Sequence, residues 1–400
     1  MIIVPELKGS IALNCFPKGC EQSVNEQINY VRAASNKTSG AKKVLVIGAS
    51  SGLGLSSRIA LAFGGAKADT IGVSWESGPS EKGIGSAGWY NNVYFREAAE
   101  KDGLTAKNFI GDAFAPDMRR QVVDYIKGEF GGSVDLVVYS LASGIRPNYA
   151  TGEKWRSSLK PTDSAFRGMT LDLQKETMNE VELPKATEKE VQDTVKVMGG
   201  EDWQDWIDFL LQSGVLADGC KTLAFSYIGS ELTYPIYLRG CIGAAKEDLH
   251  ATADRIHEQL TAAVNGGAWI AVCKALMTKS LLVIPALSVY VLTLYRVMKE
   301  QGTHEGCIEN LHRLFTEKFI GVEETVVDQD RLIRTDDREL WEETQRRVGE
   351  IMREVTADNF KELTDVEGVK KDFMKLSGFS HDKVDYSQRV SLESLQSLKA

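Results

Sequence analysis

The stretch Lys43-Val-Leu-Val-Ile47-Gly-Ala-Ser-Ser-Gly52-Leu-Gly54 decides the fold class of this chain. Its apolar first half predicts a buried strand, and Leu55–Phe63 after the glycines predicts a helix. Glycines at a strand-to-helix turn let an anion reach free backbone N–H groups, because no Cβ stands in the way. A tight turn alone would use the same residues, and the spacing differs from Gly-x-Gly-x-x-Gly. The position after a first strand favours phosphate binding.

Strand-like and helix-like segments continue to alternate after this turn. The sequence predicts further strands at Asp69–Trp75, Ala106–Ile110, Val134–Tyr139, Thr222–Tyr227 and Ala268–Cys273, and helices at Asn92–Lys101, Pro116–Phe130, Trp203–Leu211, Ala244–Val264 and Glu339–Thr356. This order is typical of a parallel sheet with right-handed crossovers. We therefore predict an α/β fold with a doubly wound parallel sheet of the Rossmann type. Residues 150–196 are polar without a sustained period, and we expect a long excursion there.

Composition narrows the class of protein. The 400 residues are 43% apolar and 26% charged with a net charge of −9, which is typical of a globular chain and argues against disorder and against a nucleic-acid-binding surface. Six cysteines without a Cys-x-x-Cys pair, and no signal-peptide pattern, predict reduced thiols in the cytoplasm. We interpret residues 1–400 as one enlarged domain, with a lead-in (1–42), a nucleotide-binding and catalytic body (43–327) and a C-terminal cap (328–400).

One apolar run, Leu281–Tyr295, raises the question of a membrane span. It is 15 residues long, contains Pro285 and is bounded by Lys279 and Arg296, whereas a spanning helix needs ~20 apolar residues. We therefore predict a buried or ligand-facing helix and no membrane span.

Polar residues at other strand ends indicate which cofactor the crevice takes. Glu76 follows the second strand, 22 residues past Gly54, where a carboxylate accepts from adenosine ribose hydroxyls. It would repel a 2′-phosphate, so NADH is favoured over NADPH; the alternative is a solvated strand end. Asp112 follows the third strand and is placed to accept from the adenine amino group. Because parallel strands end at one edge of a sheet, these turns converge with Tyr139–Ala142 on one crevice.

Tyr237 and Lys246 are the candidate proton and charge groups. In short-chain reductases a lysine ammonium binds the nicotinamide ribose and lowers the pKa of a tyrosine. A nine-residue spacing rotates ~900° on an ideal helix and would place the two on opposite sides. We therefore predict that Tyr237 lies on a turn leading into the Lys246 helix, across Gly240 and Gly243. A chance pair in a chain with 12 tyrosines is the alternative.

Several longer motifs occur in a characteristic order. They are Gly48-Ala-Ser-Ser-Gly-x-Gly54, Gly88-Trp-Tyr-Asn-Asn92, Gly111-Asp-Ala-Phe114, Tyr139-Ser-Leu-Ala142, Val197-Met-Gly-Gly-Glu-Asp-Trp203, Tyr237-x8-Lys246 and Gly302-Thr-His-Glu-Gly-Cys307. In this order they resemble the trans-2-enoyl-CoA reductases and the long enoyl-ACP reductases of the FabV type, from the first residues to Val384-Asp-Tyr386. The resemblance implies a monomeric, enlarged short-chain-dehydrogenase fold. It also implies NADH-dependent reduction of the C2–C3 double bond of an enoyl-CoA or enoyl-ACP thioester in fatty acid synthesis.

Carried over by position, the resemblance implies a role for each site residue. Tyr237 is the proton donor that stabilises the enolate after hydride addition to C3, assisted by the substrate-contacting Tyr227, and Lys246 binds the cofactor ribose. The implied cofactor contacts are Gly48, Ala49, Ser50, Ser51, Gly52, Leu53, Ser74, Trp75, Asp112, Ala113, Ser140, Leu141, Leu276, Met277 and Thr278, beside Glu76 from the strand-end argument.

The chain departs from the family pattern at a few positions. Leu53 stands where an aromatic residue is usual, and Lys383 replaces a usual glycine without a functional interpretation. Leu281 and Leu282 replace small residues near the acyl site. They either shorten the acyl pocket, which would favour crotonyl-scale substrates, or pack in the core.

Two alternatives from other classes stay open at this stage. A ketoacyl reductase would normally place its tyrosine and lysine four apart with a serine partner. A non-catalytic NAD-binding sensor would need the glycine turn but not Tyr237. His250 and His257 share a helix face, but the sequence arranges no Cys or carboxylate around them, so no metal site is predicted.

Overall fold

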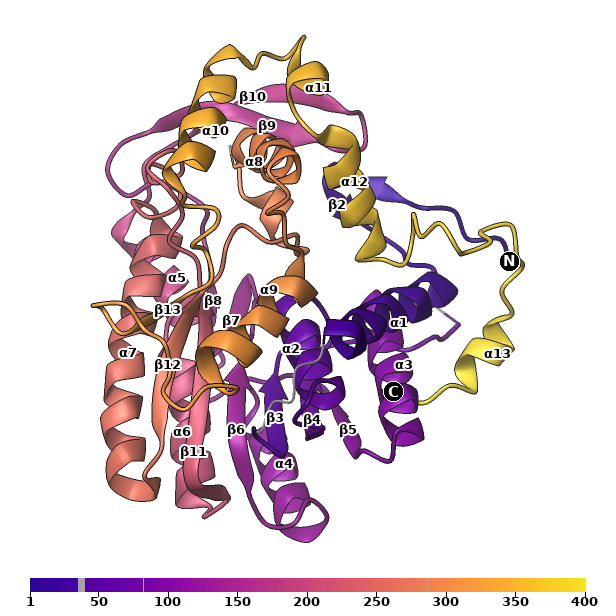
Figure 1. Ribbon diagram of the computed structural model, residues 1–400, viewed down its shortest axis with the longest axis vertical. Helices are drawn as coiled ribbons and strands as arrows, with labels where there is room; N and C mark the ends of the chain where they lie inside the picture. Colours follow the sequence, from indigo (N-terminus) through magenta and orange to yellow (C-terminus); the bar gives the residue numbers. More distant parts are fainter. Residues whose placement is uncertain (35–39, 82, 286) are drawn as a thin grey trace.

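A seven-stranded parallel sheet forms the centre of the computed structural model, which describes residues 1–34, 40–81, 83–285 and 287–400 (Figure 1). The strand order is β13 (Leu332–Arg334), β12 (Gly267–Val272), β11 (Leu216–Ser226), β6 (Val134–Tyr139), β3 (Lys43–Ile47), β4 (Asp69–Ser74) and β5 (Ala106–Ile110). Every neighbouring pair is parallel. The chain reverses direction across the sheet between β3 and β6, which is where doubly wound sheets bind ligands. The predicted fold class is confirmed.

Helices cover both faces of this sheet. One face packs with α1 (Pro17–Ala34), α2 (Gly52–Phe63), α3 (Ala87–Lys101) and α9 (Cys307–Arg313), and the other with α4 (Pro116–Gly128), α6 (Glu201–Gln212) and α7 (Cys241–Val264). Successive β3 residues alternate between the two cores: Val44 and Val46 lie in the first, Leu45 and Ile47 in the second. Burial on both sides explains why β3 is an unbroken apolar run.

The apolar run forms a short 3-10 turn, Leu281–Val283, and the helix α8 (Ser288–Glu300). Helix α8 is buried on almost every side from Ser288 to Met298, against strand β9 (Phe166–Asp172) and the C-terminal helices (Figure 1). Its hydrophobicity therefore serves a third core cluster, as the run length predicts. Across the described residues, no helix combines the length and hydropathy that crossing a bilayer requires.

The excursion is more regular than the sequence indicates. It contains an antiparallel hairpin of β9 (Phe166–Asp172) and β10 (Thr177–Leu183), a smaller pair of β7 (Ile145–Pro147) and β8 (Lys154–Arg156), and α5 (Glu188–Met198). The hairpin buries few side chains, Leu171 and Met178 among them, so its apolar alternation is too weak to predict strands.

Both ends of the chain pack onto this body. The lead-in forms β1 (Leu7–Lys8), β2 (Ile11–Ala12) and the unpredicted helix α1, whose buried Cys20, Val24, Ile28 and Val31 follow helical spacing. After the π-helical turn Leu314–Phe319 and β13, the tail forms α10 (Glu342–Glu354), α11 (Phe360–Leu363), α12 (Val366–Lys375) and α13 (Leu392–Gln396). Figure 1 shows this tail over the top of the molecule and down beside the N-terminus.

Candidate active site

The glycine turn after β3 leaves its backbone donors free. Gly48 has φ +89°, and a Cβ there would lie 2.4 Å from the Ser140 carbonyl oxygen. A Cβ on Gly54 would lie 1.9 Å from the Gly48 carbonyl oxygen, so only glycine fits. The N–H groups of Ser51, Gly52 and Leu53 have no acceptor among the described residues. Free N–H groups at the start of α2 form a cradle for an anion such as a pyrophosphate.

Glu76 lies against this turn rather than in solvent. Its carboxylate accepts from Ser50 Oγ at 2.5 Å and from Ser86 Oγ, which begins α3. Asn91 of α3 in turn donates to the Ser50 carbonyl oxygen at 2.9 Å. These bonds join β4, α3 and the glycine turn at the edge where the strands end. Trp75 beside Glu76 is 74% exposed, so its ring is open to a planar ligand.

The other predicted cofactor contacts surround the same edge. Asp112 accepts from the Phe114 N–H at 2.9 Å and from the Tyr149 hydroxyl at 2.5 Å. The Ser140 N–H donates to Ile47 of β3, and Asn92 of α3 donates to Ser74 Oγ at 2.9 Å. Ala49 and Ala113 are buried, and Leu141 packs against the second core cluster.

The loop after β12 closes one side of the glycine turn. A Cβ built on Gly52 would lie 3.2 Å from Thr278 Cγ2, so Thr278 touches the start of α2. Leu276 and Met277 before it are buried. Leu281 and Leu282 are also buried, and they pack with Met277 in the cluster that Tyr227 contacts. This packing fits the core alternative for the two leucines.

Tyr237 lies on the turn residues 231–239 that precede α7, as the spacing argument predicts. Its side chain is 7% exposed, and its ring meets the Tyr227 ring edge-to-face with centroids 4.8 Å apart. No described residue makes a hydrogen bond to the Tyr237 hydroxyl, and burial raises its pKa. The hydroxyl is therefore a donor whose hydrogen no neighbouring group takes.

Lys246 reaches the end of β11 from the first turns of α7. Its ammonium donates to the Phe225 carbonyl oxygen at 3.0 Å, and burial lowers its pKa to about 8. Tyr237 and Lys246 thus meet around the last residues of β11, since Tyr227 follows that strand directly. This convergence, with the broken segment between them, argues against a chance pair.

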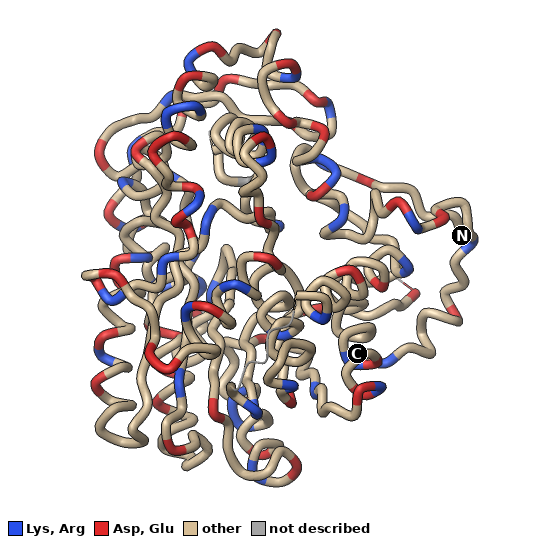
Figure 2. Tube along the Cα trace, in the orientation of Figure 1, with Lys and Arg blue, Asp and Glu red and all other residues tan. Residues whose placement is uncertain are grey.

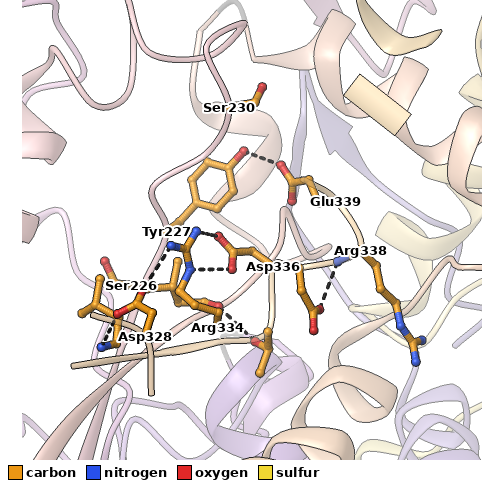
Figure 3. Close-up of polar contacts among 12 residues, drawn as sticks. Ser226, Tyr227, Ser230, Asp328, Arg334, Asp336, Arg338 and Glu339 are labelled. Carbon is orange, nitrogen blue, oxygen red and sulfur yellow. Dashed lines mark hydrogen bonds and ion pairs between the residues drawn. The ribbon is translucent and has the colours of Figure 1, made fainter. Parts of the chain in front are cut away.

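Glu339 is a site residue that sequence reasoning missed. Its side chain is fully buried and accepts from the Tyr227 hydroxyl at 2.9 Å; Figure 3 shows this bond above the ion pair of Arg334 with Asp336. A single glutamate in a charged tail carries no motif, so the sequence offered no signal for it.

His250 and His257 each contact neighbouring protein groups. His250 Nε2 lies 2.8 Å from Ser226 Oγ, and burial together with the Lys246 charge lowers its pKa to about 4. His257 packs its ring against Trp269. Within the described ranges, no group of three His, Cys, Asp or Glu side chains is placed to bind a metal ion.

Comparisons with known proteins cover the whole chain. A family model described as "Trans-2-enoyl-CoA reductase catalytic region" matches residues 83–320, one described as "NAD(P)H binding domain of trans-2-enoyl-CoA reductase" matches 2–81, and one described as "Enoyl reductase FAD binding domain" matches 327–390. An enoyl-[acyl-carrier-protein] reductase [NADH] from Photobacterium profundum is 55% identical, with all of both chains covered. A trans-2-enoyl-CoA reductase [NADH] from Clostridium beijerinckii is 47% identical, also over both whole chains.

A flavin does not fit residues 327–390. The acidic side chains of the loop before α10 are engaged in ion pairs, Arg334 with Asp328 and Asp336, and Lys318 with Asp337. Two cavities involve this segment: the one that α12 helps to line holds about 180 Å³, and the one lined by Gln329–Leu332 holds about 400 Å³. Ligand pockets hold roughly 300–1,000 Å³ and are lined mostly by apolar side chains. The larger cavity is instead lined by the ion pair of Arg331 with Asp254 and by Asp330, which does not suit a flavin ring. We derive no chemistry through a flavin.

The solved structures agree with the sequence comparisons. The crystal structure of the Clostridium acetobutylicum trans-2-enoyl-CoA reductase in complex with NADH superposes with a TM-score of 0.97 at 44% identity, covering all of both chains. That of Treponema denticola, in complex with NAD, reaches 0.92 at 42% identity over 98% of each chain. With these matches and the free cradle beside Tyr237 and Lys246, the chain belongs to the trans-2-enoyl-CoA reductase family.

Proposed function

We propose that this chain uses NADH to reduce the C2–C3 double bond of trans-2-enoyl thioesters, with short substrates such as crotonyl-CoA favoured. The observation that carries this proposal is the hydroxyl of Tyr237, whose hydrogen no described residue takes. It lies on the same sheet edge as the glycine cradle and the Lys246 ammonium. Because no described protein group takes this hydrogen, the hydroxyl is free to donate to a bound substrate.

Tyr237, Lys246 and the glycine turn each have a separate role in the proposed reaction. Bound NADH supplies the hydride that adds to substrate C3. Tyr237 donates to the thioester oxygen as negative charge develops there, and protonation at C2 completes the product. Lys246 holds a positive charge below pH 8 and can donate to the cofactor ribose while it bonds to Phe225. The free N–H groups of Ser51, Gly52 and Leu53 hold the pyrophosphate.

Glu76 supports NADH as the reductant. Its carboxylate is bound by Ser50 and Ser86, so its negative charge is fixed beside the cradle. Carboxylate oxygens accept more than one hydrogen bond, so ribose hydroxyls can still donate to it. A 2′-phosphate at the same place would meet like charge, and residues 76–79 contain no Arg or Lys to offset it.

The carrier of the acyl chain is either CoA or acyl carrier protein. Relatives named for both carriers are similar to this chain. The net charge of −9 disfavours docking of an acidic carrier, and Figure 2 shows Lys and Arg interspersed with Asp and Glu along the chain. We therefore propose CoA thioesters as the main substrates and enoyl-ACP as the alternative.

The test follows NADH absorbance at 340 nm with crotonyl-CoA, crotonyl-ACP and acetoacetyl-CoA. Fast oxidation with crotonyl-CoA supports the proposal, and a higher kcat/KM with crotonyl-ACP supports the alternative. Oxidation with acetoacetyl-CoA alone would identify a ketoacyl reductase. NADH binding without turnover on any thioester would identify a sensor.

We further propose that the chain acts as a cytoplasmic monomer built as one folding unit. All six cysteines are free thiols, which suits a reducing compartment. The tail is joined to the body through Glu339, which supports a single unit. Light scattering at several concentrations and one cooperative urea transition are expected; a stable dimer or two separate transitions would contradict these two points.

A further inference from the structure

Glu339 gathers hydrogen-bond donors from three elements around one buried carboxylate. Oε1 accepts from the Tyr227 hydroxyl at 2.9 Å and from the Tyr290 hydroxyl at 2.6 Å. Oε2 accepts from the Ala275 backbone N–H at 2.6 Å. Tyr227 follows β11, Ala275 follows β12, and Tyr290 lies on α8. One side chain of the C-terminal segment therefore connects both loops of the site to the apolar helix.

Three hydrogen-bond donors and a lysine ammonium surround this carboxylate. Burial raises the pKa of Glu339, while the three donors and the nearby Lys274 ammonium oppose that rise. All three hydrogen bonds point toward the carboxylate, and an ionised carboxylate accepts only. The tyrosine hydroxyls must therefore be the donors.

Donation to Glu339 engages the single hydrogen of the Tyr227 hydroxyl. A tyrosine hydroxyl has one hydrogen, and Glu339 takes it, so the Tyr227 oxygen can only accept from any further group. The Tyr227 ring in turn packs edge-to-face on Tyr237 at 4.8 Å. Glu339 thus fixes the direction of the Tyr227 hydroxyl hydrogen and the position of the Tyr227 ring, on which the Tyr237 ring packs.

We propose that Glu339 is a positioning residue for the reduction, acting through Tyr227 to hold Tyr237 as the donor that faces the substrate. The proposal rests on the proposed function. It gives the 327–390 segment a role at the NADH site in place of flavin binding, because the residue that this segment contributes completes the tyrosine pair.

A double-mutant cycle tests the coupling between the two residues. The parent, Glu339→Gln, Tyr227→Phe and the double variant are compared for kcat and KM with crotonyl-CoA and for NADH affinity by fluorescence. We expect each single variant to lower kcat about tenfold or more, and the double variant to lose no more than the larger single loss. Losses that multiply, or a kcat for Glu339→Gln within threefold of the parent, would overturn the proposal.

Tyr290→Phe is the matched control, because it removes the other hydroxyl from the same carboxylate oxygen without touching the Tyr237 ring. We expect it to keep kcat within threefold while Tyr227→Phe does not, a comparison that requires no variant of Glu339. An equal loss of kcat in Tyr290→Phe and Tyr227→Phe would mean that the loss of any hydrogen bond to Glu339, and not the contact with Tyr227, limits the reaction.

Activity of the parent protein tests the proposed function independently of this inference. No turnover of any enoyl thioester by the parent would contradict the function itself. The same four proteins then report the coupling by urea unfolding, which needs no substrate. Additive losses of stability there would overturn the Tyr227–Glu339 contact on which the inference depends.

Discussion

Tyr237→Phe should abolish turnover without weakening the protein. The change removes only the hydroxyl, and the ring keeps its edge-to-face contact with Tyr227. Losing one donor to a developing oxyanion costs about 2.7–4 kcal/mol, or a factor of about 10² to 10³ in kcat. The loss of the proton source adds to this. We therefore expect kcat to fall at least 100-fold.

The stability of this variant follows from the same contacts. Because no described residue bonds to the Tyr237 hydroxyl, its removal leaves no partner unsatisfied. The free energy of unfolding should stay within about 1 kcal/mol of the parent, since the hydroxyl makes no hydrogen bond within the described part of the protein. Tyr227→Phe removes a hydrogen bond to the buried Glu339 carboxylate and should lower the free energy of unfolding by about 1.5–3 kcal/mol.

The assay combines NADH oxidation at 340 nm, NADH titration by fluorescence and urea unfolding. We expect Tyr237→Phe to keep the NADH Kd within a few-fold, since Lys246 and the glycine turn are untouched. A variant that retains more than a tenth of the parental kcat would refute Tyr237 as proton donor. A stability loss of about 2 kcal/mol would refute the unpaired hydroxyl.

Three other changes test the cradle, the lysine and the leucines. Lys246 has a pKa of about 8 and loses its charge above it, so the Kd for NADH should rise as the pH goes from 7 to 9. Lys246→Met should raise the Kd at pH 7 and remove this pH dependence. A parental Kd that does not change with pH would contradict the prediction. Gly54→Ala places a Cβ 1.9 Å from the Gly48 carbonyl oxygen and should weaken NADH binding tenfold or more while lowering the free energy of unfolding by about 1–3 kcal/mol. Gly128→Ala, with nothing within 4 Å, is its control and should change neither. If Leu282 lines the acyl pocket, Leu282→Ala should raise the ratio of kcat/KM for C12 enoyl-CoA to kcat/KM for C4 enoyl-CoA. An unchanged ratio, with a free energy of unfolding lower by about 2–5 kcal/mol, would assign the leucine to the core.

Local patterns predicted the frame of the site. The β3 strand and its glycine turn lie within twelve consecutive residues, so periodicity and glycine spacing were enough to predict them. The Tyr237 turn was predicted because nine residues on a helix cannot bring two side chains to one face. The sequence did not predict the β9–β10 hairpin or α1. The hairpin buries little apolar surface, and the apolar stripe of α1, formed by Cys20, Val24, Ile28 and Val31, is narrow and lies among polar residues.

The sequence by itself determined the fold class, the glycine turn after β3 and the turn that carries Tyr237 into the Lys246 helix, because each depends on residues close together in the chain. Only the tertiary structure decided that Glu339 binds Tyr227, 112 residues away, and that Glu76 is held by Ser50 and Ser86. A lone carboxylate has no period or spacing, so its partner is set by which buried donors the packed elements bring to it. The same packing decided that the apolar run forms a core helix, whose Tyr290 shares the Glu339 carboxylate with Tyr227.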